Sequence, residues 1–221
     1  MLENLLERDV STAELTVMLA SIRKLRDAGL RLIIAGSISM ENLLQIHQIP
    51  HTVLGGLWRE LIPPFSKSEA KGYLTESLEN AFADDEAAIE LALDILPDYV
   101  PEFLSISVGY LQGCNTLVEC ENAMHQQVVP HIHRAFLHQF DERLVKHYDE
   151  TETVTAELIL DQLAKGDEQG SRLNGSDMPA GYRQVLVKLQ FDNFVIDGAD
   201  FTLRFSLNLI RKWWRASRGF A

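Results

Sequence analysis

The chain has 221 residues, of which 46% are hydrophobic, so it can bury a core large enough for one large domain or two small ones. Its formal net charge of −12 argues against a general affinity for phosphate backbones or anionic lipid surfaces. Cys114 and Cys120 are the only cysteines and form no CxxC motif, which indicates neither a disulfide scaffold nor a zinc ribbon. No stretch of the sequence is apolar enough to span a bilayer, and we expect a cytoplasmic protein that does not bind membranes.

The N-terminal part predicts a helix followed by a buried strand. Apolar residues recur at helical spacing up to Ala28, with Ser11 or Thr12 as the N-cap and Gly29 as the stop. The run 30–35 is rich in β-branched residues and too short for a helix, which predicts a central parallel strand covered on both faces. The other elements expected before residue 65 are a short helix, 40–47, and a second short strand, 58–62.

Ser37 is the first candidate functional residue, because it stands just beyond the carboxyl end of the predicted strand. In open α/β sheets, ligands and catalytic groups gather at this edge. The alternative is that Ser37 only caps the next helix, with Glu41 in the first turn of that helix. The residues alone leave both interpretations open.

Between residues 65 and 150 the sequence predicts a small helical bundle. Ser66 and Glu69 have the S-x-x-E spacing of a capping box, which opens a helix that runs to about Asn80. Pro97 and Pro101 bracket a turn between two later helices. The other helices are expected at 84–96, 102–112, 115–125 and 131–148.

From residue 151 the pattern changes to helices interrupted by a hairpin. Helices are expected at 155–164 and 182–189, and residues 191–205 alternate around an Asp-Gly-Ala-Asp turn. A basic helix, 207–218, follows. This order is typical of a winged helix-turn-helix, a fold that binds DNA or docks proteins. The acidic, threonine-rich segment 149–153 is expected to be the hinge in front of it.

Basic residues make the C-terminal end a local cationic feature on an acidic chain, because no acid occurs from Phe201 onward. The candidate contacts with DNA or a protein partner are Arg183, Lys188, Arg211, Lys212 and Arg215. The helix expected to enter a DNA major groove offers only Arg183, Gln184 and Lys188. We therefore expect protein docking, or at most weak and salt-sensitive DNA binding.

Four stretches of the sequence together resemble one known family. They are Ile22-Arg23-Lys24-Leu25-Arg26, the run LRLIIAGSISMENLL from Leu30, the run LIPPFSKSEAKGYL from Leu61, and FSLNLIRKWW from Phe205 to Trp214. They are similar to P-loop ATPases of the AAA/STAND group, in particular to AAA-like ATPases that end in a winged helix. The resemblance covers nearly the whole chain.

The resemblance implies a mostly α fold class with a small α/β remnant and three domains. Residues 1–64 would be the C-terminal half of the ATPase α/β core, with part of its sheet. Residues 65–150 would form the helical lid, and residues 151–221 the winged helix-turn-helix. By match, Ser37 would be the sensor of the ATP γ-phosphate, and Pro97 and Tyr99 would lie in the lid segment that faces the nucleotide.

Two motifs of the family do not occur in this sequence. There is no G-x-x-x-x-G-K-S/T phosphate loop and no apolar strand ending in Asp-Glu, and these hold ATP and Mg²⁺ in the family. We therefore expect a truncated C-terminal region of an ATP-binding protein, in which ATP and magnesium bind only in a longer chain. His131 and His133, at positions i and i+2 of a predicted helix, point to different faces, so no metal site is expected.

The alternative function is a stand-alone winged-helix protein that binds a partner or regulates DNA. An in-frame phosphate loop encoded upstream of Met1 would decide between the two interpretations. Self-association is a further expectation, because a buried strand at 30–35 with few neighbours would leave a free edge that can pair with another copy.

Overall fold

The computed structural model describes residues 11–31, 33, 40–53, 55, 62–78, 85–96 and 98–220, and these are mostly helical with one two-stranded antiparallel sheet. The predicted fold class, mostly α with a small sheet, is confirmed at this level. None of the described helices combines the length and the apolarity needed to cross a membrane. The helices are α2 (Thr12–Asp27), α3 (Met40–Ile46), α4 (Lys67–Ser77), α5 (Asp85–Ile95), α6 (Pro101–Leu111), α7 (Leu117–Ala123), α8 (Val129–Ile132), α9 (His138–His147), α10 (Glu150–Lys165), α11 (Tyr182–Phe191) and α12 (Asn208–Arg218), and the strands are β1 (Val195–Asp197) and β2 (Leu203–Phe205).

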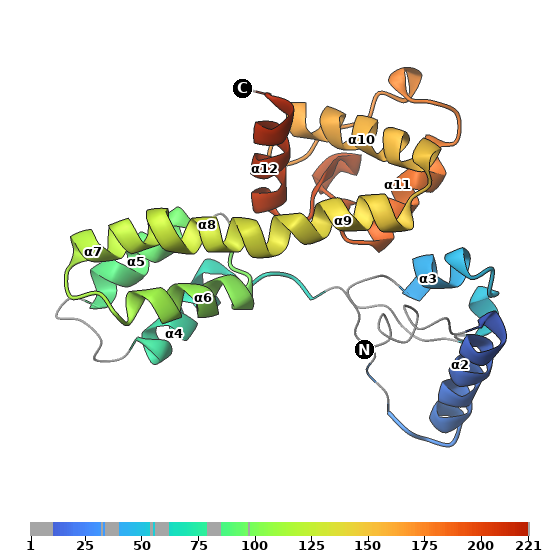
Figure 1. Cartoon of the computed structure of the whole chain (residues 1–221), viewed down its shortest axis with the longest axis horizontal. Coiled ribbons are helices and arrows are strands. Elements are labelled where there is room, and N and C mark those ends of the chain that lie inside the picture. Colours follow the sequence, from blue (N-terminus) through green and yellow to red (C-terminus); the bar gives the residue numbers. More distant parts are fainter. Residues whose placement is uncertain are drawn as a thin grey trace.

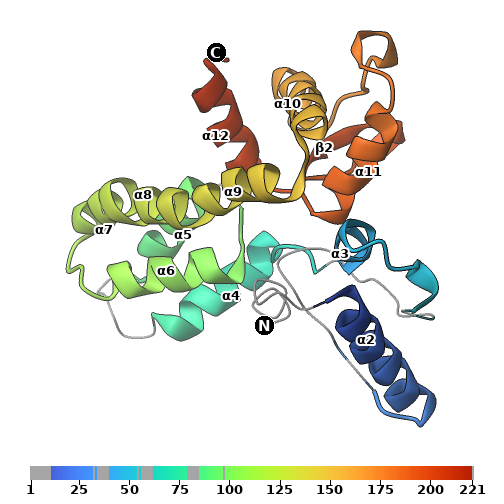
Figure 2. The ribbon, with the colours of Figure 1, turned by 45° about the vertical axis from the view of Figure 1, so that its right-hand side comes forward.

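Helix α2 forms where the sequence predicts it. It begins at a complete capping box between Ser11 and Glu14, and the chain leaves it at Gly29 with a φ of +95°, a backbone conformation that glycine adopts without steric cost. Leu15 of α2 packs with Leu44 of α3 in a small apolar core. Figures 1 and 2 show α2 apart from the other helices, with α3 between α2 and α11.

The prediction of a strand at 30–35, after α2, is wrong at the positions that the structure describes. Leu30, Arg31 and Ile33 have no strand conformation, and the Ile33 side chain is 100% exposed. A central parallel strand needs a neighbouring strand on each edge to bond its backbone groups, and among the described residues of 1–64 there is no other strand. The rest of 30–35 and most of 58–62 lie outside the described residues.

The bundle is built from α4, α5 and α6 packed beneath a long helix that starts with α7 (Figure 1). Helix α4 opens with the predicted capping box, in which the Ser66 side chain accepts from the Glu69 N–H and the Glu69 carboxylate accepts from the Ser66 N–H. Phe103 of α6 is fully buried and meets Phe136 of the long helix edge-on, with ring centroids 4.7 Å apart. The most buried side chains of this core include Leu74, Leu93, Leu104, Leu111 and Met124.

The long helix is continuous from Leu117 to His147, whereas the sequence predicts two helices separated near Pro130. Proline has no N–H and its ring clashes with the preceding turn, which favours a break. Here a π-helical turn, Met124–Val128, precedes the proline, and the Val129 N–H donates to the Met124 carbonyl. The wider turn gives the proline ring room, so the helix continues through it.

The C-terminal unit contains α10, α11, the β1–β2 hairpin and α12, in the predicted order. In the hairpin, Val195 pairs with Phe205 and Asp197 with Leu203. The predicted hinge at 149–153 is wrong, because Asp149 is instead the N-cap of α10 and Glu152 completes its capping box. The core of this unit includes Ile159, Leu160, Leu189, Phe194, Phe205, Ile210 and Trp214.

Helix α12 joins this unit to the bundle. Its residue Leu209 is buried in the bundle core, while Ile210 and Trp214 are buried in the C-terminal core. The two Asp98 carboxylate oxygens accept hydrogen bonds from the backbone N–H groups of Asn208 and Leu209, at 3.0 and 2.7 Å. A carboxylate at a helix N-terminus satisfies free N–H groups and meets the positive end of the helix dipole. The two cores are therefore connected at one helix end.

Candidate docking groove between α11 and the hairpin

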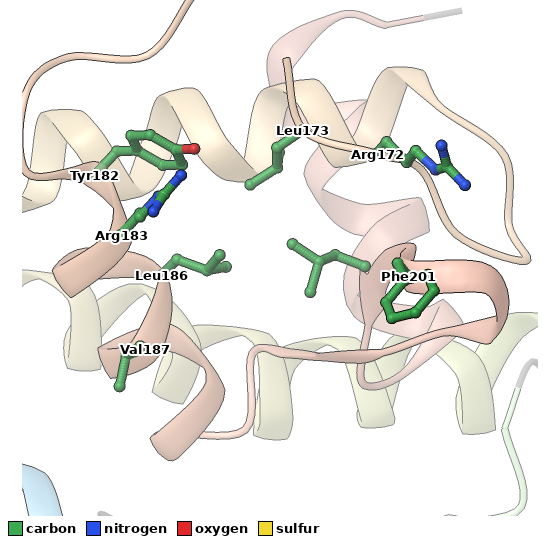
Figure 3. A pocket seen from close by; sticks show the side chains of 8 residues that line it. Arg172, Leu173, Tyr182, Arg183, Leu186, Val187 and Phe201 are labelled. Atoms are coloured by element: carbon green, nitrogen blue, oxygen red, sulfur yellow. The ribbon is translucent and has the colours of Figure 1, made fainter. Parts of the chain in front are cut away.

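An open groove of about 580 Å³ lies between α11, the loop that precedes it and the β1–β2 hairpin. Figure 3 shows side chains from these three elements around the opening, with Leu173 and Leu186 pointing toward its middle. The groove is lined by Arg172, Leu173, Tyr182, Arg183, Leu186, Val187, Phe201 and Leu203. Most of the lining is apolar, and both charged side chains in it are arginines.

Helix α11 contributes one wall of the groove because of its apolar periodicity. Val185 and Leu189 face the C-terminal core and are buried, whereas Arg183 and Val187 lie on the opposite, exposed face. Val187 is 44% exposed, and it stands at the centre of the helix where a DNA-reading helix presents polar groups. This face of α11 is therefore suited to an apolar contact.

The loop with Arg172 and Leu173 is fixed to the hairpin by a short backbone bridge. The Ser171 N–H donates to the Leu203 carbonyl at 2.8 Å, and the Leu203 N–H returns a bond to the Ser171 carbonyl at 2.9 Å. Gly170, with a φ of +122°, precedes this bridge, and a Cβ on it would lie 2.6 Å from Thr202 Oγ1. Only glycine fits there, so the close approach that forms the groove wall depends on this residue.

The tip of the hairpin presents an aromatic ring to solvent. Phe201 is 97% exposed, and both Asp200 and Phe201 have positive φ angles, 53° and 59°. Positive φ is sterically unfavourable for most residues other than glycine, and Asp adopts it more readily than most in turns. The Arg172 guanidinium donates to the Asp200 carbonyl at 3.2 Å, which holds the tip against the loop. The position of Phe201 is thus defined by the backbone around it.

Lys188, one of the predicted partner residues, is part of the core instead of the groove. Its side chain is 7% exposed, bonds Glu152 at 2.6 Å and lies over the Tyr148 ring at 4.4 Å. The Tyr148 hydroxyl donates to Asp192, and burial, followed by the nearby Asp192 carboxylate, raises the pKa of Tyr148. Because the tyrosine stays protonated, this buried polar network holds the first turn of α10 against the end of α11.

The predicted partner residues Arg211 and Arg215 bond within the chain. Arg211 donates to the Gly166 carbonyl and pairs with Glu168, and Arg215 donates to the Ala164 carbonyl. These carbonyls lie at the C-terminus of α10, where cations satisfy free acceptors and the negative end of the dipole. Lys212 is exposed on α12, and its charge opposes the burial that raises the pKa of Asp98.

Of the residues predicted to face a nucleotide, Ser37 and Pro97 lie outside the described residues. The Tyr99 hydroxyl donates to the Leu93 carbonyl, and the Tyr99 ring packs on the bundle core. Its neighbour Asp98, which no sequence signal singled out, is the residue that caps α12. In the part of the chain that the structure describes, this segment therefore connects the two units.

Of the predicted partner residues, Arg183 alone lines the groove, and it has no hydrogen-bond or ion-pair partner among the described residues. Arg172 and Phe201 were not predicted from the sequence, although an exposed aromatic residue inside an acidic turn was a usable signal.

Within the described ranges, no three His, Cys, Asp or Glu side chains come together as a metal site would require. A scan of protein-family models and searches of curated proteins and of solved structures each returned no match.

Proposed function

We propose that this chain is the C-terminal arm of an AAA/STAND-type P-loop ATPase, made of a helical lid and a winged helix, and that the winged helix docks a protein. The observation that carries the proposal is the order of the C-terminal elements. Helix α10, the bridged residue Ser171, helix α11, the β1–β2 hairpin and helix α12 follow one another as in a winged helix. In this interpretation α11 is the recognition helix and the hairpin is the wing.

Protein docking is favoured over DNA binding by the charges around the groove. The exposed face of α11 carries one cation, Arg183, while Lys188 is buried. The wing carries Asp197 and Asp200, which would repel a phosphate backbone. Arg211 and Arg215 of α12 already donate hydrogen bonds to backbone carbonyls at the end of α10. Few positive charges are thus left on this side to neutralise phosphates.

We expect that this chain alone does not bind ATP. Backbone N–H groups at a helix N-terminus and a lysine supply most of the phosphate affinity in P-loop sites, and the sequence has no such loop. The measurement is isothermal titration of the full chain with Mg-ATP, with buffer and Mg-ADP titrations as controls. No saturable heat is expected. A dissociation constant in the micromolar range would contradict the assignment of the chain as an arm without nucleotide machinery.

The second candidate function is a stand-alone winged-helix protein. It is favoured by the packing of α3 on the recognition helix, where the Asn42 side-chain amide donates to the Lys188 carbonyl at 3.1 Å. In this case the N-terminal segment would belong to the winged helix itself and not to an ATPase core. The reading frame upstream of Met1 distinguishes the candidates, since an encoded phosphate loop is expected only for the ATPase arm. Self-association through the N-terminal segment stays a prediction for both.

A further inference from the structure

We propose that the groove between α11 and the wing binds an acidic amphipathic peptide segment of a partner protein. This inference rests on the proposed docking function and adds the chemistry of the ligand. Apolar side chains of the segment would enter the groove between Leu173, Leu186 and Val187. Carboxylates of the segment would bond Arg183 and Arg172.

The apolar part of this assignment follows from side chains that the fold leaves in water. Phe201 is 97% exposed and Val187 is 44% exposed, and both line the groove beside partly buried leucines. Covering such surface is favourable by about 25 cal/mol per Å² of apolar area removed from water. Aromatic side chains at the edge of an apolar groove are frequent binding hot spots. The geometry therefore favours a ligand that brings its own apolar side chains.

The acidic part follows from the position of the two arginines. Figure 3 shows Arg183 beside Tyr182 at one end of the groove and Arg172 near Phe201 at the other end. Arg183 has no ion-pair partner among the described residues, and the one hydrogen bond found for the Arg172 side chain there is donated to the Asp200 carbonyl, so neither guanidinium is neutralised by a carboxylate. Guanidinium groups bond carboxylates through two parallel N–H groups. A segment with acids on both sides of an apolar stretch would match both ends.

Duplex DNA and a second copy of the chain fit this groove less well. A DNA backbone would bring a row of phosphates past Asp197 and Asp200 of the wing, which repel it and offset the attraction of the nearby arginines. A second copy seated in this groove would bring a whole chain with a net charge of −12 to a site that offers two arginines. A short acidic segment brings only the few charges that Arg172 and Arg183 can pair, so it meets less repulsion from the net charge of this chain.

The test uses two synthetic peptides and the full chain labelled with ¹⁵N. One peptide is an amphipathic helix of leucine, alanine and glutamate, and the other has every glutamate replaced by lysine. Amide chemical-shift changes map the site, and fluorescence anisotropy of the labelled peptide gives the affinity. We expect the glutamate peptide to shift residues of α11 and of 199–203, and the lysine peptide to leave them unchanged.

Two variant pairs separate the groove from general charge and hydrophobicity. Arg183→Glu should weaken binding of the glutamate peptide about tenfold or more, whereas Arg134→Glu, an equal charge change on the exposed side of the long helix, should not. Phe201→Ser should also weaken binding, whereas Val145→Ser, at a 75% exposed position of α9, should not. All four positions are exposed, so circular dichroism should show unchanged folding.

Several results would overturn the inference. Equal binding of both peptides, shifts that map away from the groove, or equal losses in Arg183→Glu and Arg134→Glu would each exclude a built acidic-peptide site. Absence of any binding up to millimolar peptide would do the same. Preference for the lysine peptide at the same residues would reject the acidic ligand and leave the docking function standing. Displacement of the glutamate peptide by submicromolar duplex DNA would instead contradict the docking function itself.

Discussion

Replacing Glu152 by glutamine is expected to lower the free energy of unfolding by about 2–3 kcal/mol, because it leaves the Lys188 ammonium buried without a carboxylate. Glu152 accepts from Lys188 at 2.6 Å and from the Asp149 backbone N–H at 3.0 Å. Glutamine can keep the second bond, since it is accepted at this position of a capping box. The loss is therefore assigned to the charge. Urea denaturation followed by far-UV circular dichroism measures it.

Two variants control this experiment. Glu69→Gln changes the same capping-box position of α4, where no lysine of the described residues pairs with the carboxylate, and it should cost clearly less than Glu152→Gln. Lys188→Met leaves Glu152, which is 27% exposed and can be hydrated, and should be nearly neutral. Equal losses in Glu152→Gln and Glu69→Gln would mean that the buried ion pair does not hold α10 against α11.

Replacing Phe194 by alanine is expected to have the largest effect, a loss of about 3–5 kcal/mol. Phe194 is 1% exposed and meets Phe140 of α9 edge-on, with ring centroids 5.1 Å apart. The cost combines the lost transfer free energy of the ring with the cavity that remains. The measurement is urea unfolding followed both by tryptophan fluorescence and by circular dichroism.

The matched variant is Phe103→Ala in the bundle core, where the ring is equally buried and meets Phe136. Because Asp98 and Leu209 connect the two cores at the start of α12, each variant should shift one common transition. Separate transitions, each sensitive to only one of the two variants, would contradict this connection and would indicate two independently stable units.

Local signals in the sequence predicted the local structure well. The capping box of Ser66 and Glu69 and the apolar alternation that ends at Phe205 depend on residues within a few positions of each other. The strand expected at 30–35 was wrong at its described positions, because a buried strand needs neighbours that local composition cannot supply. The continuous helix through Pro130 was missed, because a π-helical turn relieves the clash that proline normally causes.

The candidate site was harder to predict, because its residues are brought together over long sequence distances. Arg211 has the sequence appearance of a surface cation, yet it donates to the Gly166 carbonyl at the end of a helix, 45 positions earlier. Lys188 looked like a contact on a recognition helix, yet its partner Glu152 lies 36 positions away. Arg172 lies in a polar connection with no periodicity, and the bridge at Ser171 and the bond to Asp200 place it beside the hairpin. Sequence alone gives the charge of such residues and not their partners.

The central claim, that the C-terminal unit docks protein and not DNA, is tested most directly by titrating a fluorescent random-sequence duplex with the full chain at physiological salt. The account predicts a dissociation constant weaker than about 1 µM that Arg183→Glu barely changes, since few cations on this side are free to neutralise phosphates. Submicromolar binding that is lost in Arg183→Glu and kept in Arg134→Glu would contradict it, because α11 would then read DNA.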